Sequence, residues 1–482
     1  MFQILKKNSS LNGGYFIMTV LIFSAIFGTL VAALFGFTTT QKKVQVVKQS
    51  EEKALQIAEA GLDYYKWFLA HYPENVTDGT GEPGPYVHSY EDPEGSTKGK
   101  FSLEIDGNCE CGDVTFIEII STGWVSSTPQ YKKTVYGHYA RPSVAEYSYI
   151  LDDNVWAGAD REIKGPYHSN KGIRMDGENQ SMVTSAVETW DCTSSFGCSP
   201  TQEKPGVFGD GENNELWSYP VPQMDFDGIT VDFAHIKNKA QGEGGVYLPP
   251  VGGRNSDRRG YHLIFKSDST IDVYKVTNTD DALSKHIDDI NGGWYHDYFE
   301  ITNKTFVNNY DIPDSCSVVF VEDRVWLEGE ISEKVTVAAA DIAHGDFDPN
   351  IVLTDDVEYV ASADSPGITV MAENSVLIPL HSPDNLELNG IFVAQKGYFG
   401  RNLYPCWYWP YDKRSNLEIK GSIVSSKRVG TKWDYYTWSC GSTWSGYEER
   451  ENKYDKDLAD APPPFTPYTS DQYEFVEWRQ DR

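Results

Sequence analysis

The feature that most constrains this chain is an uncharged run of 21 residues, Ile17 to Phe37, close to its N-terminus. As an α-helix the run would be about 31 Å long, enough to cross a bilayer core of roughly 30 Å. A cleaved secretory signal would have a shorter apolar stretch ending in small residues, whereas this one continues into FGFTTTQKK. The run therefore predicts a membrane contact through Ile17 to Phe37. With Lys6 and Lys7 on the cytoplasmic side, we expect a single-pass inner (cytoplasmic) membrane protein with an exported head.

The helical pattern does not stop at the membrane. Apolar residues recur at spacings of three and four, which is typical of an amphipathic helix that packs against a domain. We expect residues 1–14 to form a cytoplasmic leader and residues 15–72 one transmembrane and amphipathic stem helix. A plain signal anchor on a globular domain is the alternative. The two stripes are Ala54, Ile57, Gly61, Tyr64 and Phe68, and Leu55, Ala58, Leu62, Tyr65 and Leu69.

The segments GGYFIMTVLIF and AEAGLDYYKW (Ala58 to Trp67) resemble the N-terminus of type IV pilins and pseudopilins. The likeness is closest to large minor pilins with an AEAG-type stem. It implies cleavage by a prepilin peptidase after Gly14, or after Gly13, so that Tyr15 becomes the first mature residue, often with a methylated amine. It also implies other pilin-like subunits as partners, and a cell-surface or pilus location after assembly.

One position departs from that family. Ordinary pilins carry a glutamate at the fifth mature position, where this chain has Thr19, or Met18 with the other cut. Because an unpaired buried carboxylate is costly, a subunit with no neighbour above it can do without the acid. The departure, together with a head of more than 400 residues, favours a subunit at the filament tip.

The charge of the chain limits its partners. Beyond residue 50 the chain carries 36 basic and 71 acidic residues, a balance of −35. Such an acidic head is repelled by nucleic acid and by anionic lipid, so we expect no nucleic-acid partner.

All seven cysteines lie beyond the membrane run, where an oxidising compartment permits disulfides. Cys192 with Cys198 would close a short loop, and Cys406 with Cys440 would join two parts of an aromatic region. Cys109 and Cys111 are spaced too tightly for a zinc knuckle. Neither pairing is fixed by sequence, and at least one cysteine stays without an intrachain partner.

Two kinds of β-structure follow the stem. Residues 73–144 contain alternating runs at 100–105, 115–122 and 132–139, which predict a small antiparallel, pilin-like sheet module. Farther on, NLELNGIFVAQ (Asn385 to Gln395) aligns without a gap with NLEIKGSIVSS (Asn416 to Ser426). Weaker copies are REIKGPYHS, GIRMDG and RVWLEGEIS, which begin at residues 161, 172 and 324.

Repeated strand-and-glycine units are what a β-solenoid stacks into one core. The expected fold class is therefore α+β: a long N-terminal helix with a small sheet, then a large β-rich head forming a right-handed β-helix. A β-sandwich is the alternative. We expect the solenoid in 145–187 and 318–454, an insertion with a hairpin in 188–317, and a polar tail in 455–482.

Aromatic side chains are the strongest binding signal, because exposed Trp and Tyr rings stack on sugars or anchor protein partners. The alternative is that they cover an open end of the solenoid. The loop from Gly397 to Asp412 lies between two repeat copies and is the first target for mutation. The candidate binding residues are Tyr404, Trp407, Tyr408, Trp409, Tyr411, Trp433 and Trp438, with Tyr435, Tyr436, Trp444 and Tyr447 nearby.

Metal and catalytic motifs are weak. Asp346, Asp348 and Asn350 start like a calcium loop, but Ile351 and Val357 occupy the glycine and glutamate positions of that loop. We expect no metal site and no cofactor. Binding of a calcium ion by acid-rich turns between coils is the alternative.

No hydrolase, metalloprotease or phosphate-loop motif is present, so we expect no enzyme activity. The leading hypothesis is a minor pilin-like structural or adhesive subunit of a type IV pilus or secretion pseudopilus. Its head would bind a surface polysaccharide or a protein. The alternative is a membrane-tethered β-helix carbohydrate-active enzyme or carbohydrate-binding surface protein.

Overall fold

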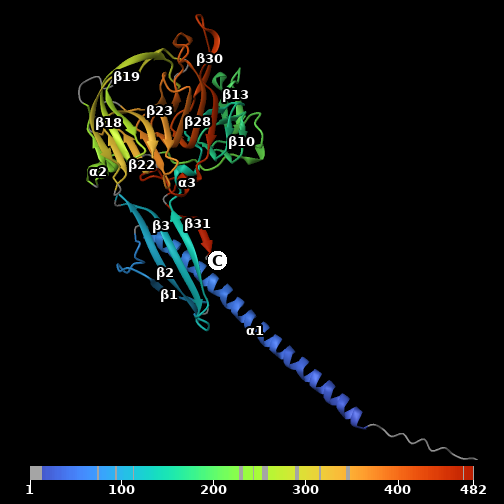
Figure 1. Cartoon of the computed structure of the whole chain (residues 1–482). Coiled ribbons are helices and arrows are strands. Elements are labelled where there is room, and N and C mark those ends of the chain that lie inside the picture. Colours follow the sequence, from blue (N-terminus) through green and yellow to red (C-terminus); the bar gives the residue numbers. More distant parts are fainter. Residues whose placement is uncertain are drawn as a thin grey trace, which may run out of the picture. The chain divides into compact units, whose positions relative to one another are not determined.

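Figure 1 shows the computed structural model of the chain. The structure describes residues 13–72, 75–92, 95–111, 113–226, 232–242, 244–251, 259–287, 292–313, 316–342, 348–470 and 472–480. Most of the expected leader, residues 1–12, therefore lies outside the described residues. The chain divides into two compact units. We call Met1–Asp106, Glu118–Gly137 and Trp478–Arg482 the stem unit, and Gly107–Ile117 and His138–Glu477 the head unit.

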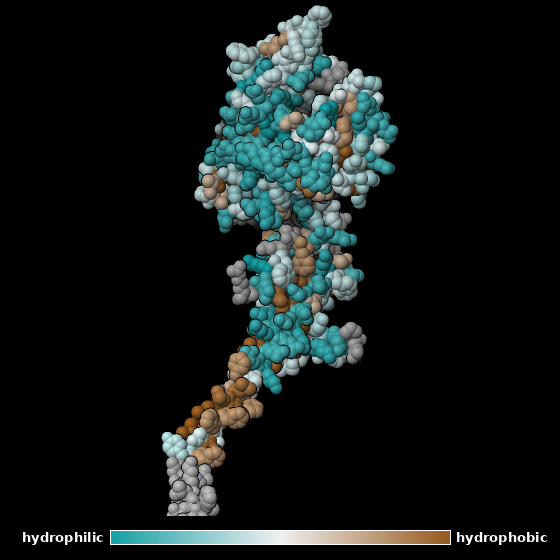
Figure 2. Space-filling view, turned by 90° about the vertical axis from the view of Figure 1, so that its right-hand side faces the viewer, coloured by the Kyte–Doolittle hydropathy of each residue, from teal (hydrophilic) through white to brown (hydrophobic). Residues whose placement is uncertain are grey.

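The stem unit is built on one α-helix, α1 (Gly13–His71). Its N-terminal part is apolar and is not covered by other parts of the described chain, which gives the brown surface in Figure 2. In the part of the chain that the structure describes, α1 is the one helix long and apolar enough to cross a membrane. The C-terminal part buries one stripe against a sheet, including Ala54, Ala58, Leu62 and Tyr65.

The sheet beside α1 has five strands in the order β1-β2-β3-β4-β31. The three runs expected at 100–105, 115–122 and 132–139 lie in β2, β3 and β4. Two further strands belong to the sheet that the sequence did not single out, β1 and the C-terminal β31. The bounds are β1 (Tyr86–Glu91), β2 (Thr97–Glu110), β3 (Asp113–Val125), β4 (Lys132–Ala140) and β31 (Glu474–Gln480).

Small residues let α1 approach this sheet closely. A Cβ atom at Gly123 of β3 would lie 2.4 Å from the backbone oxygen of Ala54 and 2.4 Å from the backbone nitrogen of Ala58. At Gly61 of α1 a Cβ would lie 2.3 Å from Ser121 Oγ. The helix and the sheet therefore meet backbone to backbone, as close packing requires.

The head unit consists of stacked coils that pair through parallel strands. The parallel strand pairs form three ladders, which we call A, B and C. A long strand bends at a corner of the coil, so that its two parts belong to different ladders. This parallel pairing differs from the antiparallel pairing of a β-sandwich. Ladder A contains β16 (Val246–Leu248), β20 (Val318–Val321), β22 (Lys334–Ala339), β24 (Gly367–Ala372), β26 (Asn385–Ala394), β28 (Lys413–Ser425), β5 (Tyr149–Leu151), β8 (Tyr167–Ser169), β11 (Val183–Ser185) and β15 (Trp217–Ser218).

Ladders B and C complete each coil. Their inward side chains join those of ladder A in one apolar core that runs through the stack. Ladder B contains β17 (Gly260–Phe265), β21 (Arg324–Ile331), β23 (Ile351–Tyr359), β25 (Val376–Ile378) and β27 (Phe399–Arg401), with β6 (Val155–Ala157), β9 (Ile173–Met175) and β14 (Val207–Phe208) in a separate parallel sheet. Ladder C contains the C-terminal ends of β21 and β23, then β26, β28, β30 (Gly441–Lys453), β7 (Glu162–Ile163) and β10 (Glu178–Asn179).

The internal repeat corresponds to the stacking register. Asn385 pairs with Asn416, and the register continues without a shift to Ala394 and Ser425. Gly390 and Gly421 have φ of +147° and +131°, and a Cβ at Gly421 would lie 2.1 Å from the Gly390 oxygen. Only glycine fits this corner, which explains the glycine that the copies share.

The order of strands in the stack differs from their order in the chain. Strand β28, near the end of the head sequence, pairs with β5, near its beginning, through Ile423 and Tyr149. Strand β30 pairs with β7 in the same way. The first coils of the sequence therefore stack on the last ones, and the chain returns between β15 and β16 to start the opposite end of the stack.

The stretch 188–317, expected as an insertion, contributes four strands to these ladders from its middle part. Strands β14 and β15 pair in parallel with β9 and β11, and β16 and β17 pair with β20 and β21. The expected hairpin is present, since β17 pairs with β18 in an antiparallel way. The remaining elements of this stretch are β12 (Thr189–Cys192), β13 (Gln202–Pro205), α2 (Phe233–Gly242), β18 (Thr270–Ser284) and β19 (Tyr295–Asp311).

The C-terminal tail packs along the outside of the stack. The Thr336 hydroxyl donates to the Pro464 carbonyl, and the Thr466 and Thr369 hydroxyl oxygens lie 2.6 Å apart. Leu458, in the short helix α3 (Lys456–Asp460), is buried. The segment expected as a polar tail is therefore an ordered cover over ladder A, and it ends in β31.

Candidate functional site: an aromatic cleft in the head unit

The head unit contains a cleft of about 1110 Å³ that we call the aromatic cleft. Its walls come from the hairpin of β29 (Lys432–Thr437) and β30, and from segments that follow β6, β12 and β18. Seven aromatic side chains and six charged ones line it. The aromatic ones are Trp156, Trp294, Trp433, Tyr435, Tyr436, Trp438 and Trp444, and the charged ones are Asp160, Lys285, Arg428, Lys432, Asp434 and Arg450.

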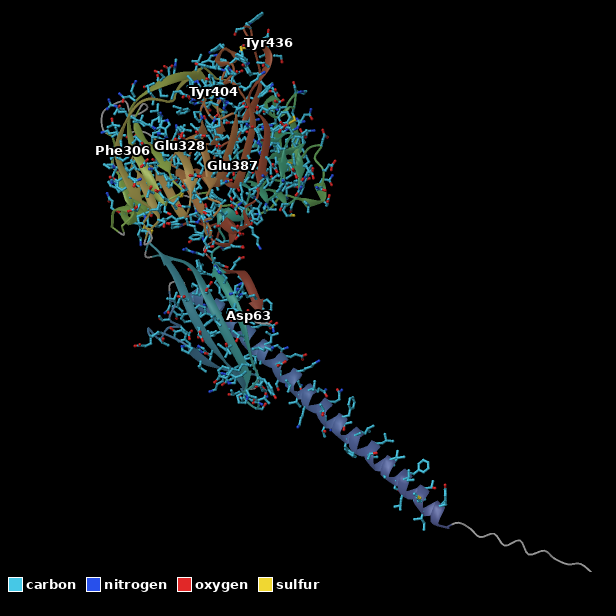
Figure 3. All side chains as sticks on the ribbon, in the orientation of Figure 1. Asp63, Phe306, Glu328, Glu387, Tyr404 and Tyr436 are labelled. Carbon is cyan, nitrogen blue, oxygen red and sulfur yellow. A yellow bond between two sulfur atoms is a disulfide. The ribbon has the colours of Figure 1, made fainter. Side chains whose placement is uncertain are left out.

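The hairpin presents its rings in two environments. Trp433 is buried, and its Nε1 donates to the Arg401 carbonyl at 2.8 Å, so this ring is part of the wall. Tyr436 and Trp438 are 64% and 96% exposed. Figure 3 shows Tyr436 near the outer end of the head, whereas Tyr404 lies inside. The outer end of the hairpin therefore offers open ring faces.

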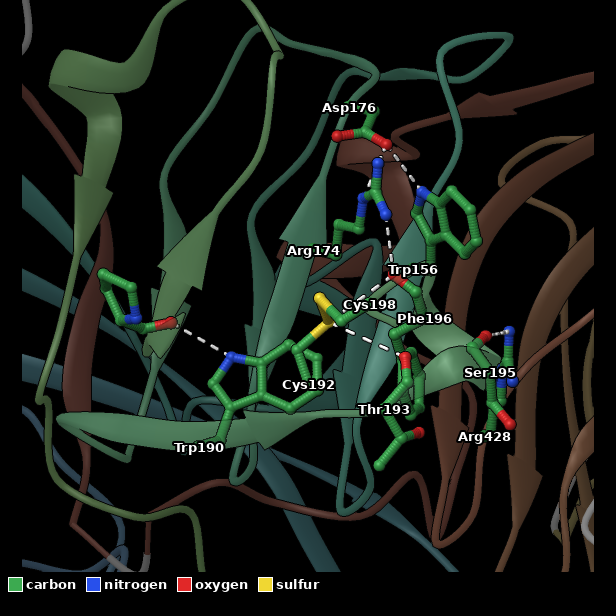
Figure 4. The surroundings of a disulfide bond; sticks show 11 residues. Trp156, Arg174, Asp176, Trp190, Cys192, Thr193, Ser195, Phe196, Cys198 and Arg428 are labelled. Carbon is green, nitrogen blue, oxygen red and sulfur yellow. Dashed lines mark hydrogen bonds and ion pairs between the residues drawn. A yellow bond between two sulfur atoms is a disulfide. The ribbon is translucent and has the colours of Figure 1, made fainter. Parts of the chain in front are cut away.

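A disulfide fixes the hairpin turn. Cys440 is bonded to Cys406, which begins a short helical turn (Cys406–Tyr408) in the loop between β27 and β28. The two segments that carry most of the predicted binding aromatics are thus joined covalently. The second pair named from the sequence, Cys192 and Cys198, is bonded as well (Figure 4). A third disulfide, Cys111 to Cys316, was not foreseen.

The predicted loop residues separate into buried and exposed groups. Tyr404 is fully buried, and its hydroxyl lies 3.1 Å from Asp297 Oδ2. Burial, reinforced by the Asp297 charge, raises the pKa of Tyr404 well above its ordinary value. The Tyr408 hydroxyl accepts the Leu283 backbone N–H at 2.6 Å, so Tyr404 and Tyr408 have structural roles. Trp407, Trp409 and Tyr411 are exposed.

Of the seven candidate binding residues, Trp433 and Trp438 line the cleft. Trp407 lies beside it, with its ring 5.8 Å from that of the cleft residue Trp294. Trp156, Trp294 and the cleft cations are not among the residues predicted from the sequence. No sequence signal joins Trp156 to the hairpin, because the two meet through the stacking of β5 on β28 and of β7 on β30.

Charges in the cleft are partly paired. Asp160 lies 3.3 Å from Lys432 Nζ and also pairs with the Arg450 guanidinium. Burial alone would raise the pKa of Asp160, but the charges of Arg450 and Lys432 outweigh it and hold this pKa below its ordinary value. Asp160 therefore stays ionised and serves as a counterion.

The described residues contain no group of three or more His, Cys, Asp or Glu side chains that could hold a metal ion. In the weak calcium-like motif, Asp346 lies outside the described residues. Asp348 pairs with Lys396 Nζ at 2.6 Å, and Asn350 accepts the Ser375 N–H at 3.0 Å. Both residues therefore have protein partners.

In the stem unit, Gly13, Gly14 and Tyr15 form the start of α1, and Tyr15 is exposed. The Thr19 hydroxyl donates to the Tyr15 carbonyl at 2.7 Å, within the same helix. Thr19 therefore satisfies its polar group without a second chain.

The structure thus defines an α+β protein with one apolar N-terminal helix and a head that carries an aromatic cleft. No protein-family model matches the sequence, and no curated protein matches it. Among solved structures, the crystal structure of the competence-associated pilin ComZ from Thermus thermophilus is similar to this chain, with 12% identity and a TM-score of 0.29. The alignment covers 90% of this chain and 97% of that one. A TM-score of this size does not establish a shared fold.

Proposed function

We propose that this chain is a minor pilin-like subunit of a type IV pilus or secretion pseudopilus, placed at the filament tip, with a β-helical head that binds a surface polysaccharide or protein. The observation that carries the proposal is α1. Its N-terminal half is apolar and exposed, and its C-terminal half is packed on an antiparallel sheet. Such a helix can be held in a membrane and later pack against other apolar helices.

Thr19 supports a terminal place in the filament. Its hydroxyl is satisfied inside its own helix, so no partner amine is required. An acid at the same position would need a partner from a neighbouring subunit, because an isolated carboxylate is costly in an apolar environment.

The parallel coils support a β-helix as the display element. One apolar core runs through the stacked coils and packs the ladder strands that carry the aromatic cleft. Exposed rings on such a scaffold lose little side-chain entropy when they bind.

A second candidate, a carbohydrate-active enzyme, has less support at this cleft. Glycoside hydrolysis requires a carboxyl group kept protonated as the acid, and such a group has a raised pKa. Asp160 has a lowered pKa and two cationic partners. The cleft therefore fits binding better than hydrolysis.

N-terminal sequencing of the mature protein tests the proposed function. We expect the chain to start at Tyr15, and a Gly14→Val variant to keep its leader because a larger side chain blocks the cut. Gly28→Val is the matched control, since no atom lies within 4 Å of a Cβ at Gly28. An intact Met1 in the wild-type protein would contradict processing and with it the filament proposal.

A further inference from the structure

The charge of the aromatic cleft is opposite in sign to that of the chain. The whole chain has a net charge of −30. The cleft is lined by four cationic side chains and two acidic ones, and one of the acids, Asp160, is already engaged by Lys432 and Arg450. A local excess of positive charge in an acidic protein attracts an anionic ligand to that place.

Among the cations of this cleft, Lys432 and Arg450 pair with Asp160, whereas the guanidinium of Arg428 lies against aromatic rings. Its guanidinium carbon lies 4.7 Å from the centre of the Phe196 ring and 5.4 Å from that of Trp433. Its one hydrogen bond among the described residues is a long one, 3.4 Å, to the Ser195 carbonyl (Figure 4). Asp153 accepts the backbone N–H of Arg428 and does not bind its guanidinium. Burial lowers the pKa of Arg428, and the charge of the nearby Asp153 opposes this effect.

Arg428 can therefore still accept a ligand. A planar guanidinium has five N–H donors and matches a carboxylate in a two-point contact. An anion bound here would replace the hydration that burial has removed, so a ligand carboxylate gains more from Arg428 than from an exposed lysine.

Aromatic rings stand beside these cations. The Trp438 and Tyr436 rings are exposed, with centroids 6.4 Å apart, and Lys432 Nζ lies 5.3 Å from the centre of the Trp444 ring. Aromatic faces bind the apolar faces of sugar rings, while cations at their edges bind acid groups.

We propose that the aromatic cleft binds an acidic polysaccharide, with a uronate carboxylate on Arg428 and sugar rings on the exposed aromatic faces. This inference rests on the proposed role of the head in binding a surface, and it names the class of ligand. Single-stranded nucleic acid also combines charge with flat rings. The small cationic excess of the cleft suits a chain with one acid group per sugar or two better than one with a phosphate on every residue.

Calorimetric titration of the full-length protein in detergent tests this inference. The probes are hyaluronan and oligogalacturonate hexasaccharides, neutral chitohexaose, and oligo(dT). We expect both acidic hexasaccharides to bind about tenfold more tightly than chitohexaose, the effect of one charge-assisted contact. The difference should shrink at about 0.5 M NaCl because salt screens the contact.

Single-residue variants test which side chains of the cleft bind the acidic sugars. Arg428→Gln is expected to reduce acidic-sugar affinity to that for chitohexaose, and Trp438→Ala to weaken both kinds of sugar. Because Trp438 is almost fully exposed, its replacement leaves the fold intact. Lys171→Gln is the control for loss of a charge, since Lys171 is exposed and does not line the cleft. Equal affinity for acidic and neutral hexasaccharides, failure of both acidic probes to bind, or tighter binding of oligo(dT) would overturn the inference. Each of these results leaves the processing test at Tyr15 unaffected.

Discussion

At the scale of single residues, Gly123 sets how closely α1 approaches the sheet. Gly123→Ala would place a Cβ 2.4 Å from two backbone atoms of α1, which cannot move aside as a flexible side chain could. We expect the variant to lose about 2 kcal/mol of local stability. Hydrogen exchange measured by mass spectrometry should then be faster in α1 peptides around residues 54–69. Gly36→Ala, where no atom lies within 4 Å, is the control, and unchanged exchange in Gly123→Ala would contradict the packing argument.

Asp323 makes the stability of the head depend on pH. Burial raises its pKa to about 6, although its carboxylate accepts backbone N–H groups from Val251 and Arg324 at 2.9 and 2.8 Å. The unfolded chain has a pKa of about 3.9 for Asp. The folded state therefore binds the proton more tightly, and the stabilisation present below about pH 4 is lost as the pH rises to about 6.

The Asp323→Asn variant isolates this contribution, because an amide does not ionise. The free energy of unfolding of Asp323→Asn relative to wild type should rise by roughly 2 kcal/mol between about pH 4 and 6. Urea unfolding across this range measures it, with the exposed Asp268→Asn as control. A difference that does not vary with pH would show that Asp323 titrates normally.

At the scale of elements, acidic and basic side chains form rows along ladder C. Glu387, Glu418, Glu451 and Glu162 occupy one register position in successive strands. Lysines two residues farther along reach back to the glutamate of the preceding coil: Lys453 pairs with Glu418, and Lys164 with Glu451 at 2.6 Å. These two pairs are ionic links between coils, whereas Lys420, which follows Glu418 at the same spacing, pairs with Asp455. The pair of Lys164 joins the first coil of the sequence to the last.

Lys164→Met removes this link while keeping the length of the side chain. Because the pair is partly exposed, we expect a loss of about 0.5–1 kcal/mol in unfolding free energy at low salt, and less at about 1 M NaCl. Lys456→Met is the control, since Lys456 is largely exposed and lies 3.9 Å from Asp460. If the two variants lost equal stability at both salt concentrations, Lys164 would not link the coils.

The repeat also shows what sequence alone can predict. The match between residues 385–395 and 416–426 is visible because partners in a parallel stack need the same alternation and the same corner glycine. The pairing of Asn452 with Ile163 could not be predicted in this way, because the weak repeat copy at residues 161–169 does not indicate which coil it stacks on. Trp156 and Arg428 could not be predicted as cleft residues for the same reason, because they come together only when distant coils stack. Exposure of individual rings, which separates Tyr404 from Trp409, depends on packing that a periodic pattern does not encode.

At the scale of the whole molecule, a disulfide that joins distant parts of the chain stabilises the head unit. The bond between Cys111 and Cys316 spans 205 residues, whereas that between Cys192 and Cys198 spans 6. Loop-closure entropy predicts a loss of about 5 kcal/mol for the double alanine variant of the long link and about 2 for the short one. All four side chains are buried, which makes the two variants comparable. Urea unfolding of both variants measures the two losses. An equal loss of unfolding free energy in the two variants would contradict this account.

The proposed tip position makes a prediction about the filament. A head unit of more than 300 residues on one helix would crowd every neighbour in a closely stacked filament. In addition, position 19 is a threonine and not the acid that would pair with a neighbour above it. A small epitope fused after Arg482 should therefore label filament ends, with one site per filament, in immuno-electron microscopy. A Thr19→Glu variant should be recovered in fewer filaments, because its carboxylate has no partner amine at the tip and is costly to bury. Labels spaced along the shaft, with Thr19→Glu assembling as well as wild type, would instead make this chain a repeated subunit.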